Sequence, residues 1–530
     1  MPVSRTRTRR LRLPNMWNVI KRSRKLLKLF FGFRALDKSH DADRQQRARR
    51  LLMLEFADAR GVMMKVGQLL AASAQADDEL NPLIKSIKPL ALKQVLPAIE
   101  AALGCSWEQV FKSIDESRAA ASLGQVHHAV LVNGDEVALK VQYPQIAKAI
   151  DAEMTLLGLM PQAGPVKKWA FDLEGYRHAL KDNMANELDY RHEADTQMFF
   201  YQNLALPGVI IPKVYAELCS KTLLVQSWET GDYLDTAANW IERDREKIAK
   251  ALLSLLITSL FKIRCLHADP HMGNSYFRYH EELGVEMVLM DYGCTIELTE
   301  QQSLALLKLI ILSRENSAEL PLKYFAAMGF DADKLGKIEA CLPRLCRYLF
   351  APFIEDKKFI LQQWEVGKKI TALLAEERWW FRSAGPVRLI FIMRAFQGLV
   401  QQLQLLKINL NWWLLMEEVI PPTLMDQARN FECADIEPSR TARMQPVIAI
   451  ANTLKVKITR NGVTRVEVDL PAEAVLDLQT FIPEKIKLKL ERSADICLPE
   501  IINKVRQTGL APQQVFDYEE NDEHYQVWLE

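Results

Sequence analysis

The sequence predicts a mostly helical α+β fold, and two observations carry this prediction. Apolar residues recur at helical spacing along much of the chain, while short alternating runs flank two turn signals, Asn133-Gly134 and Asn461-Gly462. The 530 residues are 49% hydrophobic and 25% charged, which is the composition of an ordinary globular protein. This composition excludes a disordered or fibrous protein, and the length suits two or three domains.

The first fifty residues form a basic, amphipathic segment. Eleven Lys and Arg residues precede the first acidic residue, Asp37, and apolar residues between 16 and 33 recur near helical spacing. The pattern predicts a helix that lies on a membrane rich in anionic lipid, with a helix packed on the main domain as the alternative. An Arg-rich, acid-free start also fits an organelle transit peptide. The net charge of +1 gives no indication of a nucleic-acid partner.

The remaining elements are expected in the following order. Helices should cover 44–74 and 81–104, the second broken at Pro82, Pro89 and Pro97. Strands at 125–131 and 136–141 should form a hairpin around Asn133-Gly134. The chain should then be helical from 151 to about 427, apart from strands at 222–226 and 285–290. An α+β module should follow, with a second hairpin made by 454–458 and 463–468.

Cysteine usage and hydropathy indicate an intracellular protein without a transmembrane helix. The eight cysteines are scattered without a CxxC pair, so we expect reduced thiols, no disulfides and no structural zinc. The longest apolar runs, such as 251–263, fall short of the roughly 20 residues that span a bilayer. The expected location is the cytoplasm or the inner face of a membrane, or an organelle matrix if a transit peptide is present.

Three short motifs in one order carry the chemistry. Asp269 and Asn274 stand five positions apart, as in a kinase catalytic loop, and Asp291 opens an Asp-Tyr-Gly turn after an apolar strand. Upstream, Lys140 ends a strand. In a kinase these residues are the base (Asp269), the Mg²⁺ ligands (Asn274 and Asp291) and the lysine that binds the ATP phosphates (Lys140). Each motif is weak alone, but their order predicts a kinase-like core that binds ATP and Mg²⁺.

The loop before Lys140 is rich in alanine where a kinase has glycines. Its candidate nucleotide-binding residues are Ala119, Ala120, Ala121, Ser122 and Gly124. Because alanine adopts positive φ less readily than glycine, this loop should be stiff and unable to fold its amides over the phosphates in the usual way.

These motifs resemble the UbiB (aarF-domain) family of atypical kinases, closely from about 51 to 295 and more loosely to about 427. The resemblance rests on the alanine-rich loop, the His-Ala-Asp-Pro-His-x-Gly-Asn loop at 267–274, and two charged motifs at 65–68 and 187–189. It implies a bilobal protein-kinase-like fold. The predicted organisation is a basic segment at 1–50, a helical extension at 51–118, a kinase-like domain at 119–430 whose first lobe ends near 230, and an α+β module at 440–530.

The resemblance also implies roles for charged and linker residues. Glu193 is expected to pair with Lys140, while Glu187 and Asp189 are expected to meet Lys65 across the nucleotide cleft. Gly67 and Gln68 complete the Lys65 motif, and charged faces of ordinary helices are the alternative explanation for these stretches. In the linker between the lobes, Gln226 and Trp228 are the candidate residues beside adenine, and Gln226-Ser227-Trp228 stands where the family customarily has Met, Glu and an aromatic residue.

The implied activity is ATP hydrolysis or phosphoryl transfer to a small or lipid-linked acceptor in isoprenoid quinone (ubiquinone) synthesis. The expected partners are anionic membrane lipid and an isoprenoid lipid or quinone-synthesis proteins. No long activation segment or Ala-Pro-Glu motif follows Gly293, which argues against peptide substrates. A protein kinase and a catalytically vestigial nucleotide-binding scaffold stay open as alternatives. Zinc binding by His267 and His271 is disfavoured because Pro270 between them interrupts a helix.

Overall fold

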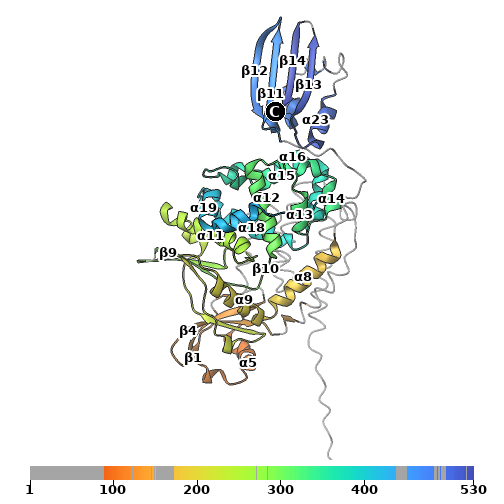
Figure 1. The fold of residues 1–530 in the computed structure, drawn as a ribbon. Coiled ribbons are helices and arrows are strands. Elements are labelled where there is room, and N and C mark those ends of the chain that lie inside the picture. Colours follow the sequence, from red (N-terminus) through yellow and green to blue (C-terminus); the bar gives the residue numbers. More distant parts are fainter. Residues whose placement is uncertain are drawn as a thin grey trace, which may run out of the picture. The chain divides into compact units, whose positions relative to one another are not determined.

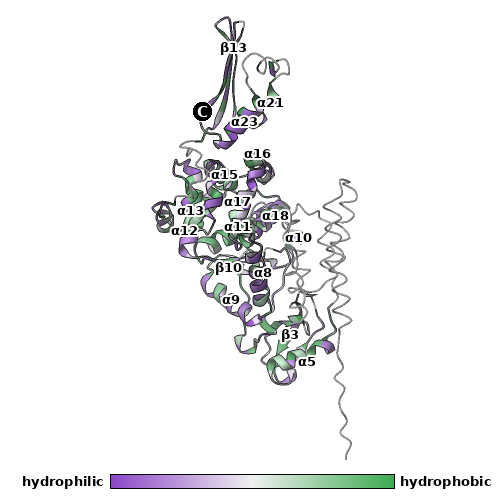
Figure 2. Cartoon of the chain, turned by 90° about the vertical axis from the view of Figure 1, so that its right-hand side faces the viewer, coloured by the Kyte–Doolittle hydropathy of each residue, from purple (hydrophilic) through white to green (hydrophobic). Residues whose placement is uncertain are grey.

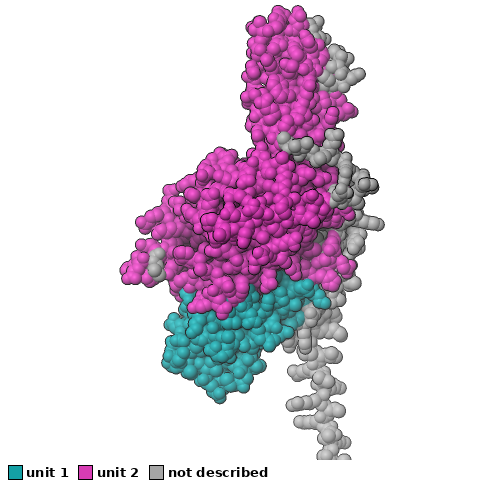
Figure 3. Space-filling view, in the orientation of Figure 1, with its two compact units in different colours: residues 1–161, 180–198, 212–229 teal, residues 162–179, 199–211, 230–530 magenta. Residues whose placement is uncertain are grey.

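The chain divides into two units, which are coloured separately in Figure 3. A computed structural model describes residues 89–117, 119–120, 123–144, 146–147, 150, 172–269, 271–282, 284–436, 450–482, 486–487, 490, 497–520 and 522–530. Unit 1 comprises 1–161, 180–198 and 212–229, and unit 2 comprises 162–179, 199–211 and 230–530. The basic segment, the predicted helix at 44–74 and the Lys65 motif lie outside the described residues.

Unit 1 is built on a five-stranded antiparallel sheet with the order β1-β3-β4-β6, in which β2 also pairs with β3. Its strands are β1 (Phe111–Ile114), β2 (Ala119–Ala120), β3 (Gly124–Leu131), β4 (Glu136–Gln142) and β6 (Leu223–Ser227). The hairpin predicted at Asn133-Gly134 is confirmed: Gly134 has φ 101° and its N–H donates to the carbonyl of Leu131 at 2.9 Å.

One helix of unit 1, α5 (Leu92–Leu103), packs against this sheet (Figure 1). The predicted break at Pro97 is wrong, because α5 runs through this residue. Val95 and Ile99 are fully buried against the sheet, and their burial outweighs the hydrogen bond that a proline cannot donate. The helix ends at Gly104, whose φ of 74° gives a left-handed cap.

Unit 2 is mostly helical up to residue 429, and this part contains two small sheets with the orders β5-β9-β8 and β10-β7. Their strands are β5 (Val209–Ile210), β7 (Cys265–His267), β8 (Ser275–His280), β9 (Gly284–Leu289) and β10 (Thr295–Glu297). The sequence predicted only the strand at 285–290, which corresponds to β9. The expectation of helix elsewhere was wrong at β7, β8 and β10. For β7 and β10 the reason is their length, because strands of three residues show no measurable alternation, whereas β8 is a six-residue strand that pairs with β9.

Helices supply the core of unit 2, and Figure 2 shows the hydrophobic residues of α11 in green. Two further helices, α8 (Leu173–Glu187) and α9 (Tyr190–Asn203), have residues in both units. The helices of unit 2 up to residue 429 are α10 (Leu234–Ala237), α11 (Glu242–Phe261), α12 (Glu300–Glu315), α13 (Leu322–Ala327), α14 (Ala332–Gly336), α15 (Leu342–Leu349), α16 (Val366–Leu374), α17 (Arg378–Ala384), α18 (Leu389–Leu406), α19 (Trp412–Val419) and α20 (Pro422–Arg429). Of all helices in the described residues, none combines the length and the hydropathy that crossing a bilayer requires.

The C-terminal part of unit 2 is a four-stranded antiparallel sheet with the order β12-β11-β14-β13. Its elements are β11 (Thr453–Arg460), β12 (Val463–Pro471), α21 (Leu478–Phe481), α23 (Leu498–Gln507), β13 (Gln513–Glu520) and β14 (Glu523–Leu529). The predicted hairpin is confirmed, with Asn461 and Gly462 at φ 50° and 72°. Leu498 and Val505 of α23 share one buried cluster with Leu342 and Leu345 of α15. The predicted domain boundaries stay predictions.

Candidate active site

In unit 1, the lysine singled out by the sequence lies on β4, an inner strand of the sheet. Lys140 of β4 stands between Val126 of β3 and Leu224 of β6, and its Nζ donates to Oε1 of Glu193 in α9 at 2.6 Å. The Glu193 side chain is 2% exposed, whereas that of Lys140 is 16% exposed. The contact implied by the family resemblance is therefore present. A buried carboxylate holds the ammonium group, which keeps some access to solvent.

The start of α9 is organised by Asp189. Its backbone carbonyl accepts the Glu193 N–H at 3.3 Å, and its Oδ1 accepts the Arg191 N–H at 3.1 Å. Burial acts to raise the pKa of Asp189, but hydrogen bonds and charge from Arg191 outweigh burial and hold this pKa below its ordinary value. Glu187 is buried, at 6% exposed. Because Lys65, Gly67 and Gln68 lie outside the described residues, the predicted contact of Lys65 with Glu187 and Asp189 stays a prediction.

The alanine-rich loop is partly described. Ala119 and Ala120 form the two-residue strand β2, which pairs with Val126 and Gln125 of β3. Ala121 and Ser122 lie outside the described residues. At Gly124 any side chain would collide with the backbone, because a Cβ there would lie 2.2 Å from the carbonyl oxygen of Val141. Gly124 is thus required for the close approach of β3 and β4, whatever its part in nucleotide binding.

The two linker residues lie at the end of β6. Gln226 pairs with Ala138 of β4, and the backbone N–H of Trp228 donates to the carbonyl of Glu136 at 3.0 Å. The ring of Trp228 lies 4.8 Å from that of His128. This end of the strand is therefore fixed by backbone pairing and ring contact, and the predicted role beside adenine stays a prediction.

In unit 2, the predicted catalytic loop follows the short strand β7. The N–H of Ala268 donates to the carbonyl of Cys294 at 2.9 Å, which ties the loop to the turn before β10. Asn274 donates through Nδ2 to the backbone carbonyl of Asp269 at 3.1 Å, and the backbone carbonyl of Asn274 accepts the Met290 N–H at 2.9 Å. The first of these bonds fixes the orientation of the Asn274 amide and leaves Oδ1 as the atom that can bind a cation.

The Asp-Tyr-Gly turn is joined to the same loop. Asp291 has a positive φ of 62°, and its Oδ1 accepts the Gly293 N–H at 3.2 Å. His267 Nε2 donates to the backbone carbonyl of Asp291 at 2.6 Å, and its ring stands perpendicular to the buried ring of Tyr292, with centroids 5.7 Å apart. His267 therefore orients the turn that carries Asp291. His271 Nδ1 accepts the Gly273 N–H at 3.0 Å.

The donor set of this loop fits Mg²⁺ bound to a nucleotide. Mg²⁺ prefers oxygen ligands and is usually held by one or two carboxylates together with substrate phosphates and water. Asp291 supplies a carboxylate and Asn274 an amide oxygen. Among the described residues no group of three or more His, Cys, Asp or Glu side chains could hold a metal by itself. One carboxylate with one amide oxygen suits a metal that the phosphates help to bind.

One charged residue at this site was missed by sequence reasoning. Arg394 of α18 donates through Nη2 to Oδ1 of Asp269 at 2.5 Å, and both side chains are less than 10% exposed. A single Arg inside an apolar helical stretch gives no motif, and 125 residues separate it from Asp269. The one available signal was a charged residue in the apolar run at 389–400.

A cavity adjoins this loop within unit 2. Its polar lining includes Asp269, His271 and Asn274, together with the buried hydroxyl of Ser259. The other walls come from leucines of α11, from Ala395, Leu399 and Gln402 of α18, and from residues of β7, β8 and β9. Nearby, burial raises the pKa of the Cys265 thiol to about 12, so this cysteine is no nucleophile at neutral pH.

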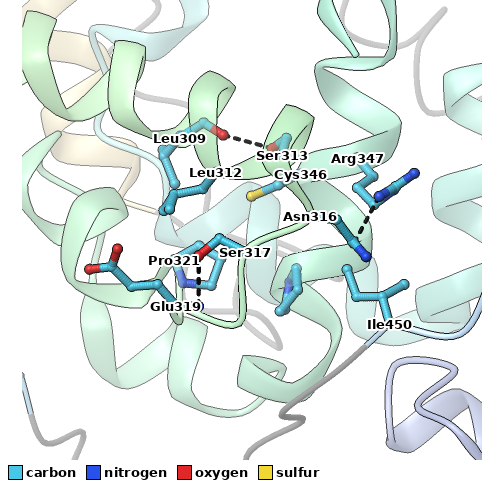
Figure 4. Close-up of a pocket in the computed structure, with 11 residues that line it drawn as sticks. Leu309, Leu312, Ser313, Asn316, Ser317, Glu319, Pro321, Cys346, Arg347 and Ile450 are labelled. Atoms are coloured by element: carbon cyan, nitrogen blue, oxygen red, sulfur yellow. Dashed lines mark hydrogen bonds between the residues drawn. The ribbon is translucent and has the colours of Figure 1, made fainter. Parts of the chain in front are cut away.

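A second pocket, lined by α12, the connection that follows it, α15 and Ile450, contains none of the predicted site residues (Figure 4). Its polar groups are already hydrogen-bonded: Ser313 donates to the Leu309 carbonyl at 2.7 Å, and Arg347 donates to Asn316 Oδ1 at 2.8 Å. This pocket is therefore no candidate for the chemistry.

Comparison with protein families agrees with the geometry. The ABC1 atypical kinase-like domain matches residues 82–320. This range includes Lys140, Glu193, Asp269, Asn274 and Asp291, but it ends before Arg394. The mostly helical α+β fold predicted from the sequence, with kinase-like architecture, is confirmed.

Named relatives share the same part of the chain. The zebrafish (Danio rerio) mitochondrial atypical kinase COQ8B is 29% identical over 252 residues, which are 46% of this chain and 39% of that protein. The probable protein kinase UbiB of Cellvibrio japonicus is 28% identical over 318 residues, 56% of each chain. The chain thus spans about two fifths to somewhat more than half of these relatives.

Among solved structures, the erythromycin complex of Rv3197 from Mycobacterium tuberculosis aligns with a TM-score of 0.48 and 23% identity, over 72% of this chain and 97% of that one. The family comparison and the curated relatives point to one group. The chain thus contains a region, residues 82–320, that is similar to the ABC1 atypical kinase-like domain, and COQ8 and UbiB proteins are among the relatives that share it.

Proposed function

We propose that this protein binds Mg-ATP and uses it for ATP hydrolysis or for phosphoryl transfer to a small or lipid-linked acceptor. The observation that carries the proposal is the ion pair between Lys140 and Glu193. Buried ion pairs contribute little net stability, so a buried carboxylate that holds a partly exposed lysine is better explained by ligand binding. In kinases the same pair presents the lysine to the α and β phosphates.

Each predicted residue then has a defined task. Lys140 binds phosphate oxygens, while Asn274 Oδ1 and the Asp291 carboxylate hold the metal. Asp269 orients the attacking hydroxyl group or water. Bound Mg²⁺ neutralises charge on the phosphates. His267 and Asn274, through the bonds described above, keep the two aspartates in one loop arrangement.

The short connection after Gly293 supports an acceptor other than a peptide. The strand β10 begins at Thr295 and α12 begins at Glu300, so few residues lie between the Asp291 turn and the next helix. In conventional protein kinases a long segment at this point forms the platform for the peptide. A protein kinase activity is therefore the weaker candidate. The resemblance to the UbiB family supports an acceptor in isoprenoid quinone metabolism.

Nucleotide binding to the purified full chain tests this proposal. We expect Mg²⁺-dependent ATP binding that falls at least about tenfold in Asp291→Asn, which loses the charge of a metal ligand, and in Lys140→Met, which loses a phosphate contact. Titration calorimetry with and without Mg²⁺ measures both affinities. Lys457→Met, a strand lysine of β11, is the matched control and should bind ATP like the wild type. Unchanged affinity in Asp291→Asn would contradict the metal assignment.

Membrane association is a separate part of the proposal. The eleven basic residues before Asp37 support binding to anionic lipid, since each contributes roughly 1 kcal/mol near a charged surface. Flotation with vesicles of phosphatidylcholine and phosphatidylglycerol should show binding that weakens when salt is raised from 0.1 to 0.5 M, a change that shortens the screening length from about 10 Å. Deletion of residues 1–36 should have the same effect. Binding that ignores salt would contradict this part.

A further inference from the structure

We propose that Arg394 of α18 positions Asp269 for phosphoryl transfer, so that the catalytic centre extends beyond the matched kinase-like domain. This inference rests on the proposed function. It is carried by the buried ion pair between the two residues, with Nη2 of Arg394 at 2.5 Å from Oδ1 of Asp269. A guanidinium group is planar and its donors have fixed directions, so it restricts the orientation of a carboxylate more than a lysine would.

The helix that carries Arg394 also packs against the catalytic loop. Phe391, one turn before Arg394 in α18, is buried with Ala268 and Cys294, the two residues joined by a backbone hydrogen bond next to Asp269. Ala395 and Leu399 on the same face belong to the core shared with α11. Residues spaced three or four apart lie on one helix face, so one surface of α18 holds the loop by packing and by the ion pair.

The other bonds of the loop fix its backbone. The bond from Asn274 Nδ2 ends on the carbonyl oxygen of Asp269, and the bond from Ala268 ends on that of Cys294. The bond from Arg394 ends on the carboxylate itself. Because Asp269 also lines the cavity with His271 and Asn274, the rotation of its carboxylate decides which oxygen an acceptor in that cavity meets.

Phosphoryl transfer depends on such positioning. The acceptor oxygen forms a bond to the γ-phosphorus while the bond from this phosphorus to the bridging oxygen of ADP breaks, and the acceptor's proton passes to Asp269 or to solvent. The transition state is loose, so the protein contributes mainly alignment and charge, and a misplacement of about 1 Å can slow the reaction roughly 10²-fold.

The test is steady-state ATP turnover by the full chain carrying Arg394→Ala. We expect kcat to fall about 10²-fold while KM for ATP and Mg²⁺-dependent ATP binding change little, because Lys140, Asn274 and Asp291 are intact. Free guanidinium ion should restore part of kcat by occupying the vacated place. The kcat of Arg394→Lys should lie between those of the wild type and Arg394→Ala, since lysine keeps the charge and loses the planar geometry.

The matched control is Arg344→Ala. Arg344 is also a buried arginine of unit 2, 4% exposed, and its Nη1 pairs with Glu473 at 3.0 Å. Neither of these residues lines the cavity beside the catalytic loop. Arg344→Ala should destabilise the protein, keep kcat, and show no response to guanidinium. If Arg394→Ala does not fold, Arg394→Lys decides, and wild-type kcat in that variant overturns the proposal.

A double-mutant cycle separates positioning through Asp269 from general loosening of α18. Arg394→Ala should have little further effect on kcat in an Asp269→Asn background, because the group that it positions is already changed. Equal effects in both backgrounds overturn the inference. The outcomes also distinguish the role of Arg394 from the proposed function. A wild type that does not bind Mg-ATP contradicts the proposed function, whereas normal turnover by Arg394→Ala contradicts only the role of Arg394.

Discussion

Two ion pairs hold the predicted catalytic side chains, one in each unit, and they differ in burial. In unit 1 Lys140 is 16% exposed and its partner Glu193 is buried, whereas in unit 2 both Arg394 and Asp269 are less than 10% exposed. The cation of the first pair can reach a ligand. The cation of the second is buried against the carboxylate that it holds. One pair is thus suited to binding and the other to fixing a loop.

The largest expected effect is on stability, in unit 2. Asp269→Leu leaves the Arg394 guanidinium buried without this carboxylate and should lower the free energy of unfolding by about 3–5 kcal/mol. Adding Arg394→Leu should recover most of this loss, because two apolar side chains replace a buried pair at little net cost. Urea unfolding followed by tryptophan fluorescence measures both. A double variant no more stable than Asp269→Leu would show that the arginine has other essential partners.

A smaller loss of stability is expected in unit 1. Glu193→Gln keeps a hydrogen-bond acceptor for Lys140 but removes the charge, and Lys140 retains access to water. The free energy of unfolding should fall by about 1–3 kcal/mol, while ATP affinity falls because the lysine is no longer held. Urea unfolding and calorimetric ATP titration of the same sample measure the two effects. A loss of stability as large as that of Asp269→Leu, with ATP affinity intact, would remove the functional difference between the pairs.

The same contrast shows what the sequence could predict. Lys140 was recognisable because it ends a strand upstream of the two loop motifs, whereas Glu193 was assigned only through the resemblance to a known family. The two Asn-Gly hairpins were predictable because a tight turn needs a residue that adopts positive φ, which is Gly134 in the first hairpin and both Asn461 and Gly462 in the second. Features encoded within a few neighbouring residues could therefore be read directly.

What could not be predicted depends on contacts between distant segments. Arg394 was missed because only the fold brings α18 to the catalytic loop. The helix through Pro97 was missed because its local signal predicts a break, and the burial of Val95 and Ile99 overrides it. The strands β7 and β10 have three residues each and exist because they pair with each other. In each case a tertiary contact outweighs a weak local preference.

The smallest expected effect concerns pH and distinguishes the units again. His127 of β3 is fully buried, its Nδ1 donates to the Asp115 carbonyl at 2.8 Å, and its Nε2 accepts from Gln125 Nε2 at 2.8 Å. The Gln125 Nε2 also donates to the Leu90 carbonyl at 2.9 Å, so the network suits a neutral imidazole. Burial lowers the pKa of His127 below its ordinary value of 6.5, against smaller raising effects of Asp115 and Glu116.

This depressed pKa gives the pH dependence a definite sign. Below pH 6.5 the unfolded chain binds a proton that the folded chain still excludes, so the stability due to His127 is complete above pH 6.5 and is lost as pH falls toward the folded pKa. One proton limits the slope of the unfolding free energy against pH to about 1.4 kcal/mol per pH unit.

Hydrogen exchange at pH 7.5 and 5.5, corrected for intrinsic rates, should show that β3 and β4 lose protection at the lower pH in the wild type. His127→Asn, whose amide can replace the Nδ1 donor, should remove this loss, and the amides of α11 in unit 2 serve as the internal reference. Equal pH dependence in His127→Asn would place the titrating group elsewhere, and the sheet that carries Lys140 would then owe its pH response to another residue.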